Sequence, residues 1–441
     1  MKLYSTHDKT HRVSWRQAVL SGLAPDGGLY MPMQIPVFST SSVHELQQLS
    51  FPDLSARLAS AFMEDEITLD TLKTLTASSL DIPLPLKQLN SNTFVFELFH
   101  GPTCAFKDFG ARFMSRLFRY FIGENAEPLT VLTATSGDTG SAVGNAFLDS
   151  ASNPPIRVAI LYPRGKVSTI QRKQMTTLGH NVVAYEIDGT FDDCQALVKR
   201  ALADQQLQKR IRLTSANSIN IARLLPQIFY YAYASLSRIN AEKPPVFIVP
   251  SGNLGNVVGS LFAKAMGFPV AHSVAACNSN RTLVDFIQNN IFSPQPSIET
   301  ISNAMDVGNP SNIHRLKALS QSLEETDGNP LSAVSISDEN TRSALREVFE
   351  NYHYVADPHT AVAASALSHS TSNRLPADAD RIIVSTAHPA KFSSTVEEVL
   401  GFAPELPQQL AHIMDAEEHI YPLHNSYEAL CSELTTSNPN I

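Results

Sequence analysis

From residue 129 onward, the sequence alternates short apolar runs with longer amphipathic segments. Runs such as LTVLTATS, RVAILYP, NVVAYEID and VFIVPSG have the β-branched and apolar content of buried strands. The segments between them, for example DDCQALVKRAL, carry apolar residues at helical spacing. Strands that alternate with helices form mainly parallel sheets covered by helices, so the sequence predicts an α/β protein.

The segment before residue 129 is predicted to be largely helical. Residues 39–81 have the spacing of short helices, and Ser14 to Gln17 form a capping-box pattern ahead of WRQAVLSG. NTFVFELFH then predicts a strand, and apolar residues from Phe106 to Phe121 predict a helix.

Two later regions lack a clear period. Residues 292–332 are rich in Pro, Asn and Ser, which predicts a long surface connection, and the tail after Ala403 is weakly patterned. MDVGNPSN and DPHTAV are interpreted as loops.

Composition excludes several classes of protein. With 43% hydrophobic and 17% charged residues, the chain of 441 residues can bury large cores, and its length favours two to three domains. A net charge of −9 argues against a general nucleic-acid or membrane surface, and no apolar run reaches membrane length. The 4 cysteines form no CxxC pair and the 14 histidines no HExxH motif, so we expect reduced thiols, no metal site and a cytoplasmic protein.

Lys107 stands out in the stretch HGPTCAFKDFGARFM (100–114) because its neighbours are apolar. Burial disfavours the charged form of an amine, and a neutral lysine is a nucleophile toward carbonyl groups. The alternative is a lysine at a helix start that extends its charged end into water.

Two glycine-rich turns each follow a predicted strand and open a helix. In PSGNLGNVVG the glycines allow close backbone approach, and successive N–H groups at a helix start can hold an anion. In TSGDTG, Ser136 and Thr139 with local N–H groups could hold a carboxylate. The alternatives are a turn without a ligand for the first motif, and Ser136 as a simple helix cap for the second.

NSINIAR is a third strand-to-helix turn, and Arg223 within it has the planar fork that binds phosphate in a bidentate manner. The alternative is a solvated arginine on a capped helix. Lys166, Arg172 and Lys173 add positive charge nearby, but we expect them on a solvated helix face.

These stretches, together with MKLYSTHD…PDGGLYMP, HGPTCAFKDF and STAHPAKF, occur in an order that resembles the threonine synthase family from residue 1 to about residue 400. The resemblance implies a pyridoxal 5'-phosphate enzyme of the tryptophan-synthase-β-like fold, with two α/β domains that contain parallel sheets and an N-terminal helical extension. It implies four parts: an N-terminal region (1–92), a large cofactor-binding domain (93–128 and 208–405), a small domain (129–207) and a tail (406–441).

The resemblance also assigns roles to individual residues of this sequence. Lys107 would bind the cofactor covalently and act in catalysis. The other cofactor-binding residues would be Gly252, Asn253, Leu254, Gly255, Asn256 and Thr386, with Thr386 at the ring nitrogen. The substrate-binding residues would be Thr135, Ser136, Asp138, Thr139, Asn217, Ser218 and Arg223. Related enzymes of the fold have Asn where Asp138 stands, so its contact with the phenolic oxygen of the cofactor stays open.

The implied reaction converts O-phospho-L-homoserine and water to L-threonine and phosphate, the last step of threonine biosynthesis. Rival readings are another enzyme of the same fold, such as threonine dehydratase or cysteine synthase, or a binding protein that has lost catalysis. A second phosphate site favours threonine synthesis from O-phospho-L-homoserine over the reactions of these other enzymes. The presence of Lys107 argues against a binding protein.

The assignment of Lys107 predicts the behaviour of Lys107→Ala. The variant should still admit the cofactor through its phosphate loop but form no covalent bond with it. Borohydride reduction followed by mass spectrometry should therefore fix the cofactor to the wild type only, and equal labelling of both proteins would contradict the assignment.

Overall fold

The computed structural model describes residues 1–123, 127–150, 155–239, 241, 243–327, 330–368, 375–376 and 378–435. Contacts divide the chain into two compact units, which are described separately below. Unit 1 contains Met1 and residues 32–101 and 224–405, and unit 2 contains residues 2–31, 102–223 and 406–441. Unit 2 thus joins residues 102–128 and 208–223 to the segment 129–207. The division into four parts that the resemblance implies stays a prediction.

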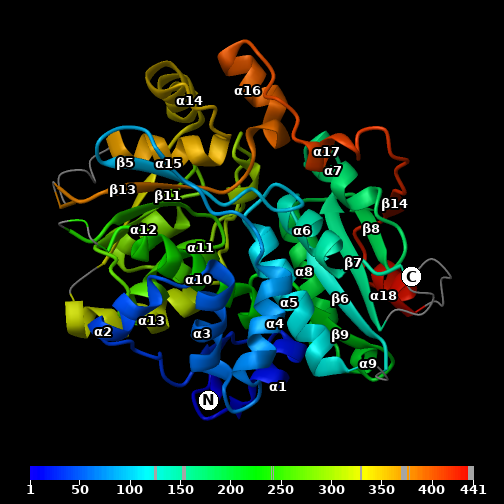
Figure 1. The fold of residues 1–441 in the computed structure, drawn as a ribbon. Coiled ribbons are helices and arrows are strands. Elements are labelled where there is room, and N and C mark those ends of the chain that lie inside the picture. Colours follow the sequence, from blue (N-terminus) through cyan, green and yellow to red (C-terminus); the bar gives the residue numbers. More distant parts are fainter. Residues whose placement is uncertain are drawn as a thin grey trace. The chain divides into compact units, whose positions relative to one another are not determined.

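Unit 2 is built on a five-stranded parallel sheet. Its strand order is β14 (Tyr421–Leu423), β8 (Val182–Ile187), β7 (Ile156–Pro163), β6 (Leu129–Ala134) and β9 (Arg212–Ser215). Figure 1 shows β6, β7 and β8 side by side, in cyan to green. The alternation of strands and helices predicted from the sequence is confirmed here.

Helices cover both faces of this sheet. On one face, Leu132 and Leu161 pack in a buried cluster with Leu197 of α8 (Phe191–Ala203). On the other, α6 (Asp138–Phe147) lies so close that a Cβ on Gly144 would be 3.2 Å from Ile160. Because side chains alternate along a strand, the neighbouring residues Ile160 and Leu161 point to opposite helices. Helix α7 (Thr169–Thr176) packs against α6, and α9 (Gln205–Gln208) follows α8.

The predicted helix after the HGPTCAF stretch is α5 (Lys107–Ile122), which packs against α6 and against α1 (Trp15–Ser21). Ser14 caps α1 by accepting a hydrogen bond from the Gln17 N–H, and Gly22 ends it with a φ of 75°. A small sheet of β1 (Leu3–Ser5), β2 (Arg12–Val13) and β3 (Tyr30–Pro32) lies at the chain's start, and the sequence patterns did not predict it.

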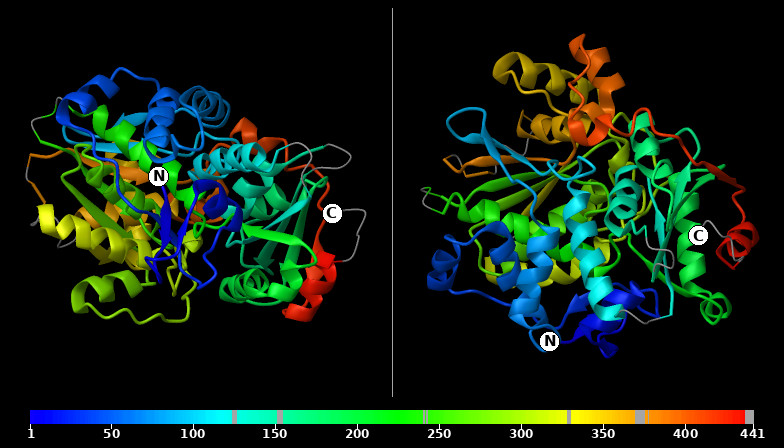
Figure 2. Two further views of the ribbon diagram at one scale, coloured as in Figure 1. Left: turned by 90° about the horizontal axis from the view of Figure 1, so that it is seen from below. Right: turned by 45° about the vertical axis from the view of Figure 1, so that its right-hand side comes forward.

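The C-terminal tail has more structure than its weak pattern predicts. It contains α17 (Gln408–Ala411), β14 at the edge of the sheet, and α18 (Tyr427–Thr435). Leu430 of α18 is buried in the cluster that α8 forms with the sheet, and Figure 2 shows the red α18 beside the green α8. These elements are held by tertiary contacts and therefore leave little periodic signal in the sequence.

Unit 1 contains a six-stranded sheet in the order β12 (Leu331–Ser335), β11 (His272–Cys277), β10 (Val246–Pro250), β13 (Arg381–Ser385), β5 (Thr93–Glu97) and β4 (Leu86–Gln88). All pairs are parallel except β4 with β5. Val246 and Ile248 pack with Val362 of α15 (Pro358–Ser368). Phe247 points the other way, with its ring 5.0 Å from the Tyr231 ring of α10 (Ile221–Leu236).

The remaining helices of unit 1 are α2 (Thr40–Leu46), α3 (Phe51–Met63), α4 (Leu69–Ser79), α11 (Gly255–Ala265), α12 (Thr282–Asn289), α13 (Ile313–Asp327), α14 (Asp338–Tyr352) and α16 (Ser393–Leu400), with short 3-10 turns at Asn303–Met305 and Pro389–Phe392. The first three confirm the helices predicted within residues 39–81. Among the others, α11 packs against β10 and β11, and α12 packs against β12. Pro226 lies inside α10.

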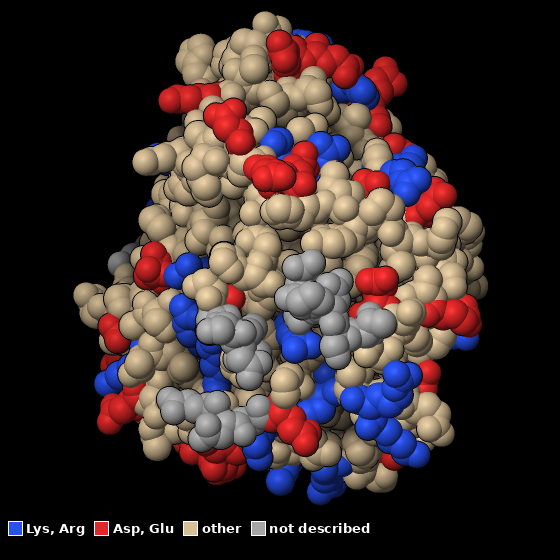
Figure 3. Space-filling model, turned by 90° about the vertical axis from the view of Figure 1, so that its right-hand side faces the viewer, with Lys and Arg blue, Asp and Glu red and all other residues tan. Residues whose placement is uncertain are grey.

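The face of the molecule shown in Figure 3 carries acidic and basic side chains among larger uncharged areas. Both signs of charge occur on it. Within the described ranges, no helix combines the length and the apolar character needed to cross a membrane.

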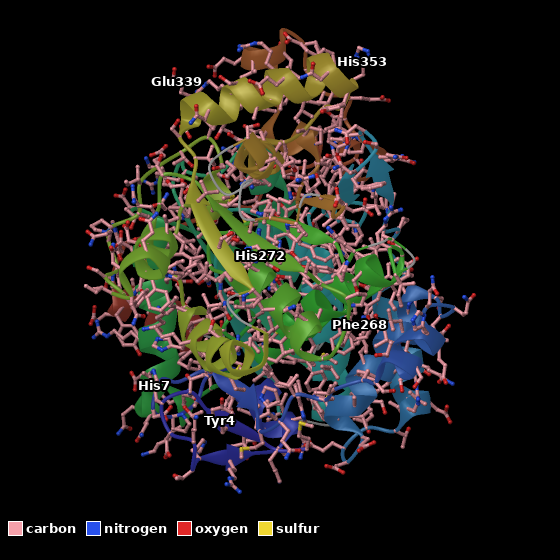
Figure 4. All side chains as sticks on the ribbon, turned by 90° about the vertical axis from the view of Figure 1, so that its left-hand side faces the viewer. Tyr4, His7, Phe268, His272, Glu339 and His353 are labelled. Atoms are coloured by element: carbon pink, nitrogen blue, oxygen red, sulfur yellow. The ribbon has the colours of Figure 1, made fainter. Side chains whose placement is uncertain are left out.

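Two expectations about unit 1 are wrong. Residues 292–332 are not only a surface connection, because they contain the whole of α13 and the first two residues of β12. The Pro and Asn residues around α13 hide its helical period. DPHTAV is not a loop but the start of α15, where Pro358 occupies the first turn and needs no hydrogen bond. In Figure 4, Glu339 and His353 mark the two ends of α14.

The packing of α5 predicts the effect of shortening its side chains. Phe113 is fully buried, whereas Tyr120 on the same helix is 43% exposed. Phe113→Ala should lower the free energy of unfolding by about 3–5 kcal/mol, because it leaves a cavity, and Tyr120→Ala should change it by about 0.5 kcal/mol or less. Urea unfolding followed by circular dichroism measures both, and similar midpoints for the two variants would contradict this packing.

Candidate active site

Lys107 follows a loop that hydrogen bonds hold in one conformation. The buried Asp108 carboxylate accepts bonds from the Thr103 N–H at 2.9 Å and the Thr103 hydroxyl at 2.6 Å. Gln174 of α7 donates to the Thr103 carbonyl oxygen at 3.0 Å, and Cys104 adopts a left-handed φ of 55°. The backbone that presents Lys107 is therefore fixed from both sides.

The Lys107 amine lies in a polar environment as well as an apolar one. Its Nζ is 4.7 Å from the centre of the Phe106 ring and 3.4 Å from Asp138 Oδ2, and its side chain is 15% exposed. The sequence indicated only the apolar contacts of the Lys107 amine. The structure adds an ion pair with Asp138. An amine held this way differs from the water-exposed lysine that was the alternative.

The TSGDTG turn places Asp138 at the start of α6. Thr135 precedes the N-cap residue Gly137 by two positions, and its hydroxyl oxygen accepts bonds from the N–H groups of Gly137 at 2.8 Å and Gly140 at 2.9 Å. Ser136 and Thr139 are half-buried, and within the described ranges no hydrogen bond of their hydroxyl groups is found. Ser136 is therefore not the cap, and both hydroxyl groups can accept or donate to a ligand.

The NSINIAR turn is tied to the end of the neighbouring strand β6. The Asn217 amide accepts a bond from the Ala134 N–H at 3.1 Å and donates to the Ala134 carbonyl oxygen at 2.6 Å. The following Ser218 is half-buried. Asn217 thus holds the turns after β6 and β9 together, a role that the sequence did not indicate.

Arg223 is buried against α5. Its Nη1 donates to the Ala216 carbonyl oxygen at 2.6 Å, and only 4% of the residue is exposed. A Cβ on Gly110 would lie 2.8 Å from Arg223 Nε, so the glycine permits this approach one helical turn after Lys107. Unit 2 therefore brings Lys107, Asp138, the TSGDTG turn and Arg223 to one side of its sheet.

In unit 1, the predicted anion loop joins β10 to α11. Leu254 has a left-handed φ of 64°, and no side chain caps the start of α11. A Cβ on Gly252 would be 2.7 Å from Met305 Cα, so this position requires glycine. The first N–H groups of α11 remain as donors for an anion.

Asn256 supplies a further donor at this loop. Its Oδ1 accepts bonds from the hydroxyl groups of Tyr230 at 2.6 Å and Tyr231 at 2.8 Å. These bonds orient the amide, and its buried Nδ2 has no partner in the part of the chain that the structure describes. A buried donor without a partner beside an uncapped helix start fits the phosphate of a cofactor.

The MDVGNPSN motif positions the same loop. Asn253 Oδ1 accepts a bond from the Ser311 N–H at 2.6 Å, and its carbonyl oxygen accepts one from Asn312 Nδ2 at 2.9 Å. The fully buried Arg315 donates to Asn312 Oδ1 at 2.8 Å, and burial lowers its pKa to about 9. The Asn253 side chain is thereby engaged by protein, and the motif stabilises the loop's shape.

Thr386 directly follows β13 and is 6% exposed. Its hydroxyl group makes no hydrogen bond within the described ranges, so it does not cap the strand. Two residues later, burial first and the nearby His100 second lower the pKa of His388 to about 4. The imidazole is therefore neutral at pH 7 and accepts a bond from the Ala390 N–H at 3.2 Å.

A buried network anchors the strand end next to Thr386. The Ser385 and Thr360 hydroxyl oxygens are 2.8 Å apart, and Thr360 also donates to the Asp357 carboxylate. Asp357 further accepts from the His359 N–H at 2.9 Å and from its ring Nδ1 at 2.6 Å. DPHTAV, to which the sequence assigned no role, thus holds the helix α15 against the end of β13.

Comparison with known proteins identifies the family. A family model of pyridoxal-phosphate dependent enzymes matches residues 77–386, a model of the threonine synthase N terminus matches residues 2–80, and a model of the threonine synthase C-terminal part matches residues 360–432. Threonine synthase of Escherichia coli is 42% identical over 421 residues, which cover 94% of this chain and 95% of the relative. The chain belongs to the threonine synthase family.

Solved structures agree with this assignment. A crystal structure of threonine synthase from Escherichia coli has a TM-score of 0.92 at 41% identity, covering 98% of this chain and 99% of that chain. A structure of threonine synthase from Brucella melitensis with bound pyridoxal phosphate has a TM-score of 0.87 at 31% identity and covers 99% of each chain. The predicted family, fold class, lyase activity in threonine biosynthesis and pyridoxal phosphate cofactor are confirmed.

Sequence analysis missed several residues of this site. Gln171 bonds to Asp138, and Tyr230 and Tyr231 orient Asn256. A signal for Gln171 was present, because Ser168 and Gln171 form an S-x-x-Q capping box. The neighbouring Arg172 donates two bonds to the Glu418 carboxylate, and Lys173 donates one to the Ala416 carbonyl oxygen. These bonds hold the C-terminal tail.

The Asn256 geometry predicts the effect of Asn256→Asp. The new carboxylate can still accept bonds from Tyr230 and Tyr231, but it replaces the Nδ2 donor with a negative charge beside the phosphate. Cofactor affinity should fall at least about tenfold. Titration of the apoprotein with pyridoxal phosphate by absorbance measures this, with Asn340→Asp on the exposed face of α14 as the control. Equal affinities for the two variants would remove Asn256 from the phosphate site.

Proposed function

We propose that this protein converts O-phospho-L-homoserine and water to L-threonine and phosphate. The observation that carries the proposal is the presence of a second candidate anion site besides the glycine-rich loop. Unit 1 offers the uncapped start of α11 with Asn256, and unit 2 offers the buried Arg223 beside α5. A cofactor phosphate needs one such site, and a phosphorylated substrate needs another. Enzymes of this fold that act on serine or threonine have no such need.

The residues of unit 1 supply the cofactor site in this proposal. The N–H groups from Gly252 to Asn256 and the Asn256 amide would bind the phosphate, and the hydroxyl of Thr386, which directly follows β13, would meet the ring nitrogen. The bound cofactor supplies a conjugated ring that withdraws electrons from the substrate's Cα. The Thr386 hydroxyl group would donate a hydrogen bond to the ring nitrogen without placing a charge on it, and the nearby His388 is neutral at pH 7.

Lys107 is the proposed catalytic residue. Its amine would bind the cofactor covalently and then carry protons at the substrate's Cα and Cβ. The fixed loop around Thr103 and Asp108 holds the backbone of Lys107, so the side chain alone has to move. Asp138, 3.4 Å from Nζ, is positioned to keep the amine in place.

The turns of unit 2 supply the proposed substrate site. Arg223 and Ser218 would bind the substrate phosphate, while Ser136 and Thr139 would bind its carboxylate at the start of α6. Thr135 and Asn217 remain predicted substrate residues, and their side chains are engaged in holding the two turns. Their contribution to binding would therefore come through the position of the backbone.

We further propose a small-molecule substrate, no nucleic-acid partner and a cytoplasmic location. All four cysteines are free, and burial raises the pKa of the Cys277 thiol to about 12. This supports a protein that works in a reducing compartment. In the part of the chain that the structure describes, no group of three or more His, Cys, Asp or Glu residues could hold a metal.

The decisive experiment supplies purified, cofactor-loaded protein with O-phospho-L-homoserine, L-serine or L-threonine in separate reactions. We expect equal amounts of phosphate and threonine from the first and slow or no turnover of the others. Ammonia and a 2-oxo acid from serine or threonine, without threonine from phosphohomoserine, would contradict the proposal.

Arg223→Ala should weaken substrate binding much more than cofactor binding. Loss of a charge-assisted pair costs roughly 1.5–3 kcal/mol, which raises the KM for phosphohomoserine about ten- to a hundredfold. Arg172→Ala is the control, because Arg172 makes a two-bond contact with Glu418 away from the proposed site. If cofactor affinity falls while the KM stays unchanged, the two phosphates have been assigned to the wrong sites.

A further inference from the structure

Gln171 is fully buried on α7 and belongs to no predicted set of site residues. Its amide oxygen accepts a bond from the Ser168 N–H at 3.0 Å, and its amide nitrogen donates to Asp138 Oδ1 at 2.9 Å. Since a backbone N–H can only donate, the amide oxygen must face Ser168 and the nitrogen must face Asp138. The contact therefore requires an unprotonated oxygen on Asp138.

The backbone is shaped to admit this amide. Gly137 has a φ of 133°, and a Cβ there would lie between 2.4 and 2.6 Å from the side-chain amide atoms of Gln171. Any other residue at position 137 would displace the amide from Asp138. The glycine and the glutamine thus form one arrangement across α6 and α7.

The two oxygens of Asp138 have different partners. Oδ1 accepts from Gln171, and Oδ2 is 3.4 Å from the Lys107 amine. The bond to Gln171 restricts the rotation of this carboxylate. With Oδ1 held by Gln171, Oδ2 faces Lys107.

We propose that Gln171 is a positioning residue for the catalytic lysine, acting through Asp138. It holds the Asp138 carboxylate toward Lys107 and so keeps the amine where it bonds to the cofactor and carries protons. The inference rests on the proposed role of Lys107, but it does not depend on which amino acid is the substrate.

Gln171→Glu separates this role from helix capping. A glutamate oxygen can still accept from the Ser168 N–H, because Glu fills the same position in capping boxes as Gln does. Its other oxygen would face Asp138 Oδ1, and two carboxylates so close repel each other. Asp138 must then take up a proton or turn away from Lys107.

The expected results concern both the cofactor and the rate. The visible absorbance maximum of the bound cofactor should shift, and borohydride should fix less of it to Lys107 in a fixed time. The value of kcat should fall about ten- to a hundredfold while the KM changes little. The midpoint of thermal unfolding should also fall, because both carboxylates are buried and repel each other. The absorbance and rate are therefore measured at a temperature where the variant is folded.

Ser168→Ala is the matched control on the same helix. It removes the hydroxyl that accepts from the Gln171 N–H at 3.2 Å, but leaves the amide bond to Asp138. This variant should lose stability, by about 1 kcal/mol, and keep the wild-type absorbance and kcat. The proposal is overturned if Gln171→Glu shows wild-type absorbance and borohydride labelling, or if Ser168→Ala changes them equally.

Failure of the proposed function would look different. A wild-type protein that binds the cofactor but does not convert phosphohomoserine would refute the substrate assignment. The absorbance and labelling of Gln171→Glu need no substrate, and they would still decide the role of Gln171.

Discussion

Parallel strand pairing is the constraint on which the candidate site depends. In a parallel sheet the carboxyl ends of neighbouring strands meet at one edge, and ligand sites form in the turns that leave them. In unit 2, β6 and β9 are neighbours, so the TSGDTG and NSINIAR turns emerge together. In unit 1, β10 and β13 are neighbours, so the anion loop and Thr386 likewise emerge together. Residues far apart in the sequence are thus brought to one edge of each sheet.

Buried polar side chains then hold each turn in a single shape. Asp108 bonds to Thr103 ahead of Lys107, and Asn217 bonds to both backbone groups of Ala134. Asp357 bonds to Thr360, which bonds to Ser385 at the end of β13. An unpaired buried polar group would cost roughly 1–3 kcal/mol, and these groups satisfy one another. Within the described ranges, the Asn256 Nδ2 and the Thr386 hydroxyl make no such bond, and both belong to the proposed cofactor site.

Glycines permit the approaches that this arrangement needs. Gly252 lies against Met305, Gly110 against Arg223 and Gly137 against Gln171, each at distances that a Cβ could not occupy. The first two positions lie at the proposed cofactor and substrate sites, and the third lies against the glutamine proposed to orient Asp138. Substitution there would disturb function through geometry even where the overall fold survives.

Local patterns in the sequence determined the strands and helices, the glycine-rich turns and the position of Lys107. Each of these features rests on residues close together in the chain: period two or 3.6 for the elements, and Gly with Ser or Thr for the turns. Only the tertiary structure decided that Asp138 pairs with Lys107, that Tyr230 and Tyr231 orient Asn256, and that the tail adds β14 to a sheet. These contacts join residues that are distant in sequence, and their energy comes from burial and hydrogen bonding between elements. For that reason no local pattern of the chain contains them.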